Sequence, residues 1–184
     1  METPDGITPP FDVGDQLSAR LAQLGQEHCV FLRNGQLYAV AVGTAREVLI
    51  GESITSVPQA PEALIGVLNL RGEVLPLLRL DTLLDLPARP YLAADDQVLV
   101  LSCGGTDLGV IVDRVREVRP IDPKQITAIP AEISAHRLFK GCWEGPSGRV
   151  IILDADGLVA AAVALVTRGF RERRGERQQT GETK

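Results

Sequence analysis

The chain has 184 residues, of which 45% are hydrophobic and 23% charged, and its formal net charge is −5. This length and composition suit a globular protein with one sizeable domain or two small barrels that share a core. An acidic balance with no dominant basic face argues against a general nucleic-acid-binding protein.

Cysteine usage and hydropathy indicate a cytoplasmic protein. The three cysteines, Cys29, Cys103 and Cys142, lie far apart and form no CxxC motif, so we expect reduced thiols and no disulfide framework. No run of about 18 apolar residues occurs, and the N-terminus is acidic and contains several prolines. We therefore expect no signal peptide, no membrane span and no direct insertion into a membrane.

Residues 1–27 are expected to form a flexible lead followed by one amphipathic helix. Asp12 can cap this helix and Gly25 can end it. Between them the apolar residues recur at helical spacing, namely Val13, Leu17, Leu21 and Leu24. This apolar stripe can pack on the chain's own domain or dock on another protein, and the sequence favours the first alternative.

From residue 28 the pattern changes to short strands. Residues 29–33 and 36–42 are strand-like runs joined by Asn34-Gly35, the strongest short signal for a β-hairpin. A further strand is expected at 47–50. Pro61 suits the first position of a short helix over 61–65.

The stretch 66–76 predicts a pair of strands with a tight turn at Arg71-Gly72. Gly72 can take a positive φ at no steric cost, which suits the corner. A guanidinium beside a turn between two buried strands should bind a carboxylate or backbone carbonyls. Arg71 therefore either braces its own loop or contacts a partner, and the residues leave these two alternatives almost equal.

The second half of the chain repeats this pattern of short strands and turns. Strands are expected at 97–101 and 108–112, on either side of Gly104-Gly105, and a last hairpin pairs 139–143 with 149–153.

The C-terminal part is predicted to be a helix followed by a tail. Asp154 or Asp156 can cap a closing helix over about 154–166, whose alanines are strong helix formers. The Arg-rich remainder, 167–184, has almost no apolar residues, so we expect it to be disordered.

Many short strands separated by Gly, Pro and Asn turns indicate a mainly β fold, built from barrels with a few short helices. The strands fall into two clusters, about 28–86 and about 97–153. We therefore expect two small β-barrels packed together, each built from one cluster.

The residues offer no site for catalysis, a cofactor or a metal ion. His28 and His136 lie at no ligand spacing from each other or from a cysteine, so a zinc site is not expected. No phosphate loop or dinucleotide fingerprint occurs, and Leu101 stands where a nucleophile elbow needs glycine. The alternative of an enzyme that uses Cys103 or Cys142 with His136 has no positive sign in the sequence.

With these features in place, the chain resembles the CheW family of chemotaxis adaptor proteins over roughly residues 28–166. No single motif is decisive, but the motifs occur in the family's order and with its spacing. They are Phe31 and Tyr38, Arg46-Glu47-Val48, Pro58 and Pro61, Gly66-Val67, Asn69-Leu70-Arg71-Gly72, Val74-Leu75-Pro76, Leu80, Leu108-Gly109, Ile111-Val112-Asp113, Val115, Gly141 and Val150-Ile151-Ile152-Leu153-Asp154.

The resemblance implies two five-stranded SH3-like β-barrels around a shared hydrophobic core, and no catalysis. It also implies an adaptor that bridges the cytoplasmic tip of methyl-accepting chemoreceptors to the regulatory domain of a CheA-type histidine kinase. Such an adaptor is cytoplasmic and associates with receptor arrays through these partners. The alternative within the family is a regulator that competes for array positions, or an adaptor of a type IV pilus or other chemosensory pathway.

Carried over by position, the resemblance implies that Glu47 and Val48 lie where the first barrel meets its partners. Gly66 and Arg71 would lie near the groove for the receptor tip. There Arg71 would position a receptor carboxylate or brace a neighbouring glutamate such as Glu47.

Three further positions carry more ordinary alternatives, and a fourth departs from the family's pattern. Val98 and Leu108 would line the apolar side of the same groove, but the residues themselves favour plain core packing. Asp113 follows a buried strand, so we expect it to cap a turn or pair with an arginine such as Arg114 or Arg116. Ala45 is smaller than the aliphatic residue usual before Arg46 in the family, which implies a shallower groove.

Overall fold

The computed structural model describes residues 27–50, 53–87, 93, 95–133 and 136–181, with side chains as far as residue 173. The lead and helix expected over 1–27 lie, apart from Glu27, outside the described residues. In the part of the chain that the structure describes, no helix is long and apolar enough to cross a membrane.

The described residues form ten strands, two short helices and one long helix. In chain order they are β1 (Glu27–Arg33), β2 (Gln36–Ala41), β3 (Ala45–Ile50), β4 (Leu64–Leu70), β5 (Glu73–Leu78), α2 (Leu80–Leu83), β6 (Gln97–Cys103), β7 (Thr106–Val112), β8 (Arg114–Pro120), the 3-10 helix η1 (Pro123–Gln125), β9 (Phe139–Gly145), β10 (Gly148–Leu153) and α3 (Ala155–Gly181).

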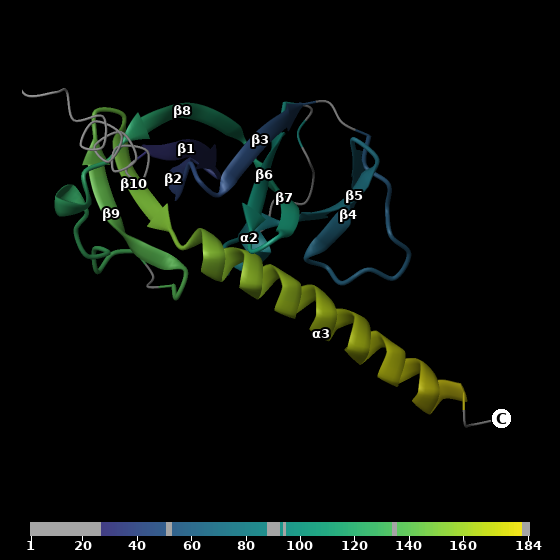
Figure 1. The fold of residues 1–184 in the computed structure, drawn as a ribbon. Coiled ribbons are helices and arrows are strands. Elements are labelled where there is room, and N and C mark those ends of the chain that lie inside the picture. The colour runs from purple at the N-terminus through teal and green to yellow at the C-terminus, as the bar shows by residue number, and fades with distance from the viewer. Residues whose placement is uncertain (1–26, 51–52, 88–92, 94, 134–135, 182–184) are drawn as a thin grey trace, which may run out of the picture.

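The strands build two five-stranded sheets that lie side by side (Figure 1). The first sheet has the order β8-β1-β2-β10-β9 and the second has the order β3-β6-β7-β5-β4. Neighbouring strands are antiparallel except for the pairs β2·β10 and β5·β7, which are parallel. The predicted mainly β fold with two five-stranded units is confirmed, and we call these units the first and second barrel.

The predicted division of the strands between the barrels was wrong. The first barrel combines 27–41 with 114–153, and the second occupies the sequence between them, from β3 to β7. The alternation of apolar residues identifies a strand but carries little information about its partner. β2 pairs with β10 through contacts such as Tyr38 with Ile151, which lie more than a hundred residues apart in the chain.

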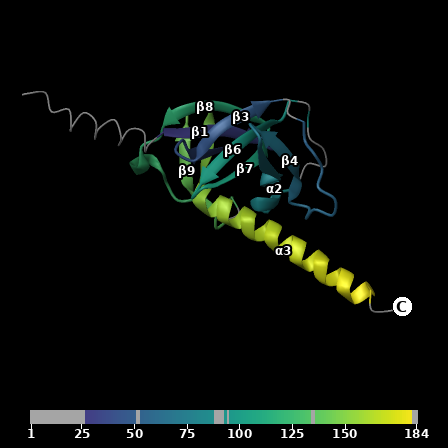
Figure 2. The same ribbon diagram turned by 45° about the vertical axis from the view of Figure 1, so that its right-hand side comes forward.

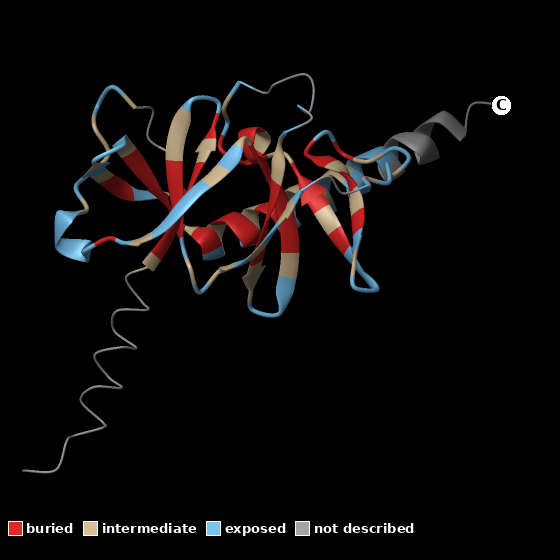
Figure 3. Ribbon diagram, turned by 90° about the horizontal axis from the view of Figure 1, so that it is seen from above, coloured by how far each residue is buried: buried red, intermediate tan, exposed pale blue. Residues whose placement is uncertain are grey.

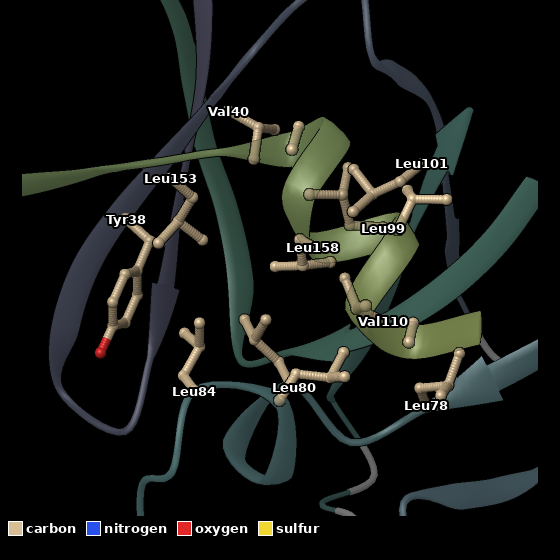
Figure 4. Packing of buried hydrophobic residues seen from close by; sticks show 14 of the residues in the cluster. Tyr38, Val40, Leu78, Leu80, Leu84, Leu99, Leu101, Val110, Leu153 and Leu158 are labelled. Carbon is tan, nitrogen blue, oxygen red and sulfur yellow. The ribbon is translucent and has the colours of Figure 1, made fainter. Parts of the chain in front are cut away.

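A shared core joins the two barrels, as expected. Phe31 and Tyr38 of the first barrel lie in the same buried cluster as Leu99 and Val110 of the second, with Leu158 of α3 among them. Figure 4 shows Leu158 between the side chains of the two barrels. In Figure 3 the buried residues follow the strands and the half of α3 that lies closer to the barrels, whereas the turns are exposed. Each barrel also has a smaller core of its own.

α3 is longer than the sequence predicted. Its first turns are buried against the shared core at Ala155, Leu158 and Ala162. The helix does not end near 166 but continues to Gly181, past the second barrel (Figures 1 and 2), so 167–181 is helical and not disordered as predicted. Arg, Glu and Gln are good helix formers even without an apolar face.

α3 stays close to the second barrel as far as Gly169. A Cβ added there would lie 2.6 Å from Pro61, so only glycine allows this approach without a shift of the two backbones.

The helix predicted at 61–65 does not form. Leu64 N donates to Pro61 O over 2.9 Å, which closes one turn, but Leu64 then begins β4 and pairs with Leu78 of β5. The strand pairing thus overrides the helix signal of Pro61. The short helix of this region lies later, at Leu80–Leu83.

Candidate protein-contact surface

The turn between β4 and β5 has the geometry that the sequence predicted. Arg71 and Gly72 both have a positive φ, of 54° and 91°, as in the type I′ turns that suit hairpins. The Asn69 Oδ1 accepts a hydrogen bond of 2.9 Å from the Gly72 amide. Asn69 and Gly72 therefore shape the corner, and Arg71 is held at its tip.

Arg71 contacts Glu47, which is the neighbouring glutamate that the resemblance suggested for it. The distance from Arg71 Nη2 to Glu47 Oε2 is 2.9 Å. Glu47 lies on β3, at one end of the second sheet, and Arg71 directly follows β4, at the other end. The ion pair therefore closes the seam between the two end strands of the second barrel.

Glu47 keeps one oxygen that is free to accept a further hydrogen bond. Its Oε1 is buried, and among the described residues it has no hydrogen-bond partner. Arg46 Nε lies 3.9 Å from this oxygen, which is beyond hydrogen-bond distance. Arg46 itself is paired with Asp107. A buried carboxylate oxygen without a hydrogen bond is costly, so a shift of the Glu47 side chain that brings Oε1 to a donor would be stabilising.

Exposed apolar side chains lie within three residues of Glu47 or Arg71 along the chain. Val48, Ile50 and Val74 are 39%, 67% and 73% exposed. Along β3 the residues alternate between partly buried and exposed, so Val48 and Ile50 project from the face opposite to Glu47 and Leu49. We call the exposed residues Val48, Ile50, Arg71 and Val74, together with Glu47, the seam surface.

Gly66 is required by packing and does not present a surface. A Cβ at this position would lie 2.5 Å from the Thr55 carbonyl oxygen and 2.7 Å from Ile54 Cγ2. The segment is held close because Thr55 and Val67 exchange two backbone hydrogen bonds of 2.9 Å.

Val98 and Leu108 pack in the interior. Val98 is 6% exposed and belongs to the second barrel's own core, and Leu108 is 1% exposed and belongs to the shared core. This corrects the placement that the resemblance implied, in favour of the core packing that the residues themselves favoured. Ala45 packs partly buried against the shared core.

Sequence reasoning missed a buried charge cluster between the barrels. Arg33, at the end of β1, donates to Asp81 of α2 and to Asp113 between β7 and β8. Asp113 therefore pairs with an arginine, as expected, but this arginine is Arg33 and neither Arg114 nor Arg116. Burial disfavours the charge on Arg33, but the carboxylates of Asp81, Asp113 and Asp96, Asp81 foremost, together outweigh it and keep the pKa of Arg33 above its ordinary value. No motif spacing signals such a contact.

The residues considered for catalysis each have other contacts or surroundings that disfavour reactivity. His136 lies 3.3 Å from Asp85 and against the Phe139 ring. Cys103 donates to Asp156, and this hydrogen bond raises the pKa of its thiol. Burial raises the pKa of the Cys142 thiol. A raised pKa makes a thiol a poorer nucleophile. Among the described residues, no cluster of three or more His, Cys, Asp or Glu could hold a metal ion.

Comparison with known proteins gives one consistent result. A family model described as "CheW-like domain" matches residues 27–163. The chemotaxis protein CheW of Bacillus subtilis is 30% identical over 107 residues, which cover 58% of this chain and 67% of that protein. The CheW of Klebsiella aerogenes is 28% identical over 142 residues, which cover 75% and 84%.

A solved structure agrees with these relatives. The scaffolding protein TtCheW from Thermoanaerobacter tengcongensis superposes with a TM-score of 0.64 at 29% sequence identity. The match covers 73% of this chain and 92% of that one.

Proposed function

This chain belongs to the CheW-like domain family, and from that premise we propose how its surface serves the family's function. It is a chemotaxis adaptor that couples receptors to a CheA-type histidine kinase. The fold is accordingly the pair of SH3-like barrels of that family.

The seam surface is the contact for the regulatory domain of the kinase. Three exposed aliphatic side chains, Val48, Ile50 and Val74, supply apolar area that a protein partner can bury. The observation that carries this assignment is that these side chains lie within three residues along the chain of Glu47 or Arg71, which form an ion pair in which Glu47 Oε1 still lacks a donor. A partner N–H or O–H group supplies it once the Glu47 side chain turns Oε1 toward the surface.

Arg71 acts mainly as a positioning residue in this proposal. Its guanidinium holds β3, which carries Val48, against the β4–β5 turn, which leads into β5 with Val74. Because its side chain is 73% exposed, it retains donors for a carboxylate of the partner. The receptor tip is the second partner, and it contacts the adaptor elsewhere than at the apolar part of the seam surface.

The adaptor works without catalysis, in the cytoplasm, at receptor arrays that it reaches through its partners. The support is the scaffold character of the family and the raised pKa of the thiols of Cys103 and Cys142. We also propose that the chain divides into an N-terminal lead, a CheW-like domain over about 28–166 and a C-terminal extension.

The test is a pull-down of the full chain with the purified regulatory domain of the kinase and, separately, with a receptor cytoplasmic fragment. The double variant Val48→Asp/Val74→Asp should lose kinase binding and retain receptor binding. Val118→Asp is the matched control, because Val118 is 56% exposed on β8 of the first barrel. It should bind both partners as the unchanged chain does.

Two other results of these pull-downs would change the proposal. Unchanged kinase binding by the double variant removes the seam surface from the proposal. Binding of the unchanged chain to the kinase alone points to the competing regulator or to an adaptor of another chemosensory pathway.

A further inference from the structure

The first barrel carries a cavity that the proposed function does not use. Its volume is ≈ 520 Å³, and residues of the β1–β2 and β9–β10 turns line it, among them Gly35 and Gly148. It therefore lies at the end of the first barrel where these two turns are found. Sites for small molecules commonly measure about 300–1,000 Å³, so the size suits a small ligand.

The floor and one wall of the cavity are apolar. Val30 and Val150 line it and are each 2% exposed, as part of the first barrel's own core. Trp143 forms a flat wall, and its ring is fixed because Nε1 donates to Gln125 Oε1 over 3.2 Å. The guanidinium carbon of Arg119 lies 4.9 Å from the centre of this ring, in a cation–π contact.

A β-bulge places Arg116 at the cavity. Val30 and Phe31 of β1 lie opposite Glu117 and Val115 of β8, so Arg116 is an additional residue with no partner across the strand pair. Neighbouring residues of a regular strand point to opposite faces, but here both Arg116 and Glu117 line the cavity. Bulges redirect side chains in this way and are frequent beside binding sites.

The charges at the cavity leave one guanidinium unpaired. Arg149 is engaged by Glu144 at 2.6 Å and by Glu132 at 2.7 Å. Arg119 lies 3.5 Å from Glu117. Arg116 is exposed and has no ion-pair partner among the described residues. The site therefore suits a ligand with one negative charge.

We propose that this cavity binds a small organic anion whose single carboxylate is held by Arg116 and whose apolar body rests on Val30, Val150 and Trp143. A guanidinium can hold a carboxylate through two parallel hydrogen bonds. The same chemistry is found in a free aromatic acid and in the C-terminal residue of a peptide with an apolar side chain, so the test includes both.

Trp143 is the only tryptophan of the chain, so its fluorescence reports on this wall of the cavity alone. The full chain is titrated with 3-phenylpropionate and, as the uncharged control, with 3-phenylpropanamide. We expect a saturable change in Trp143 emission with the acid, at about millimolar affinity for so small a ligand, and none with the amide.

Substitutions test whether Arg116 is the cation that holds the carboxylate. Arg116→Gln should weaken binding of the acid by about tenfold or more, which is the usual loss for one charge-assisted contact. Arg114→Gln is the matched control, because Arg114 lies on the same strand but outside the cavity lining. Circular dichroism checks that both variants are folded. If Arg116→Gln unfolds, Arg116→Lys replaces it and should retain part of the affinity.

The proposal is overturned if the acid produces no saturable change, if the amide binds equally well, or if Arg116→Gln binds as the unchanged chain does. The peptide acetyl-Ala-Ala-Phe with a free C-terminus is compared with its C-terminal amide. Tighter binding of this peptide than of 3-phenylpropionate identifies a chain terminus as the source of the anion, and weaker binding identifies a free small molecule. A failure here leaves the seam surface untouched, because the kinase pull-down tests the other barrel.

Discussion

Arg33 and Asp81 form an ion pair that is almost closed to solvent. Arg33 Nε lies 2.7 Å from Asp81 Oδ1, a second contact joins Nη2 to Oδ2, and the side chains are 1% and 0% exposed. Arg33 ends β1 of the first barrel and Asp81 lies in α2, directly after β5 of the second. This buried ion pair thus links the two barrels directly, in addition to their shared core.

We expect Asp81→Asn to destabilise the protein by about 3–5 kcal/mol, because it leaves the guanidinium of Arg33 buried without its main counter-charge. The measurement is equilibrium denaturation by urea. Asp107→Asn is the control: it breaks the ion pair with Arg46, whose side chain is 39% exposed, and should cost at most about 1 kcal/mol. Equal losses in the two variants would contradict the role of the buried pair.

Gly66→Ala should destabilise the second barrel, because its Cβ would meet the Thr55 backbone oxygen at 2.5 Å. We expect a cost of about 1–3 kcal/mol, as for other overpacked sites. In Gly43→Ala the new Cβ meets nothing within 4 Å, so this variant is the matched control for the same chemical change. Both are compared by thermal unfolding, and a Gly66→Ala midpoint no lower than that of Gly43→Ala would show that the neighbouring segment yields.

Arg71→Ala should weaken partner binding while the fold remains intact. Its ion pair with Glu47 is largely exposed on the arginine side, so its loss should cost at most about 1 kcal/mol of stability. The check is a pair of measurements, the thermal midpoint and the affinity for the kinase regulatory domain. A variant that simply unfolds would make Arg71 a structural brace and remove its role at the seam surface.

Stability at low pH should depend on Asp154, the residue before α3. A hydrogen bond from Lys140 is the main cause of its lowered pKa, and the amides of Gly157 and Asp156 add to it. Because the folded pKa is below the unfolded value of about 3.9, the ionised carboxylate stabilises the fold above that pH. This contribution is lost as the pH falls through the folded pKa.

Asp154→Asn should therefore lower stability at neutral pH and flatten its decline below about pH 4. Urea denaturation at a series of pH values measures both effects. A variant whose stability falls with acid as steeply as that of the unchanged chain would assign the pH dependence to other carboxylates.

The outer part of α3 should contribute little to stability. Arg171, Glu172 and Arg173 are all exposed, so deletion of 171–184 should change the free energy of unfolding by less than about 0.5 kcal/mol. Deletion of 164–184 should cost clearly more, because Leu165 and Val166 pack against the shared core. Equal effects of the two deletions would show that the core does not depend on these two side chains.

The sequence was informative wherever the structure is determined locally. Asn34-Gly35 and Arg71-Gly72 form their predicted turns with positive φ, because turn geometry depends on two or three adjacent residues. The contact between Arg71 and Glu47 was one of the two alternatives that the resemblance implied for Arg71. The other was a contact with a receptor carboxylate. The apolar seam residues Ile50 and Val74 were not singled out, because exposure depends on which side of a strand the barrel covers.

Other features depend on distant parts of the chain. The parallel pairing of Tyr38 with Ile151, the pair of Arg33 with Asp81 and the bulge at Arg116 all join segments between 48 and more than 100 residues apart. Spacing along one sequence carries no signal for these contacts. The continuation of α3 was missed because a lack of apolar residues predicts disorder, although the helix propensity of the same residues supports a helix.

The interleaved strand order also constrains how the protein is made. All five strands of the second barrel are consecutive along the chain, whereas β1 and β2 of the first barrel are separated from β8, β9 and β10 by the whole of the second. During synthesis the second barrel can complete its sheet once β7 has emerged. The hairpin of β1 and β2 is made first but gains its last neighbours only when β10 leaves the ribosome. Closure of so long a loop is slow, and until then the apolar faces of Phe31 and Tyr38 are uncovered and open to aggregation.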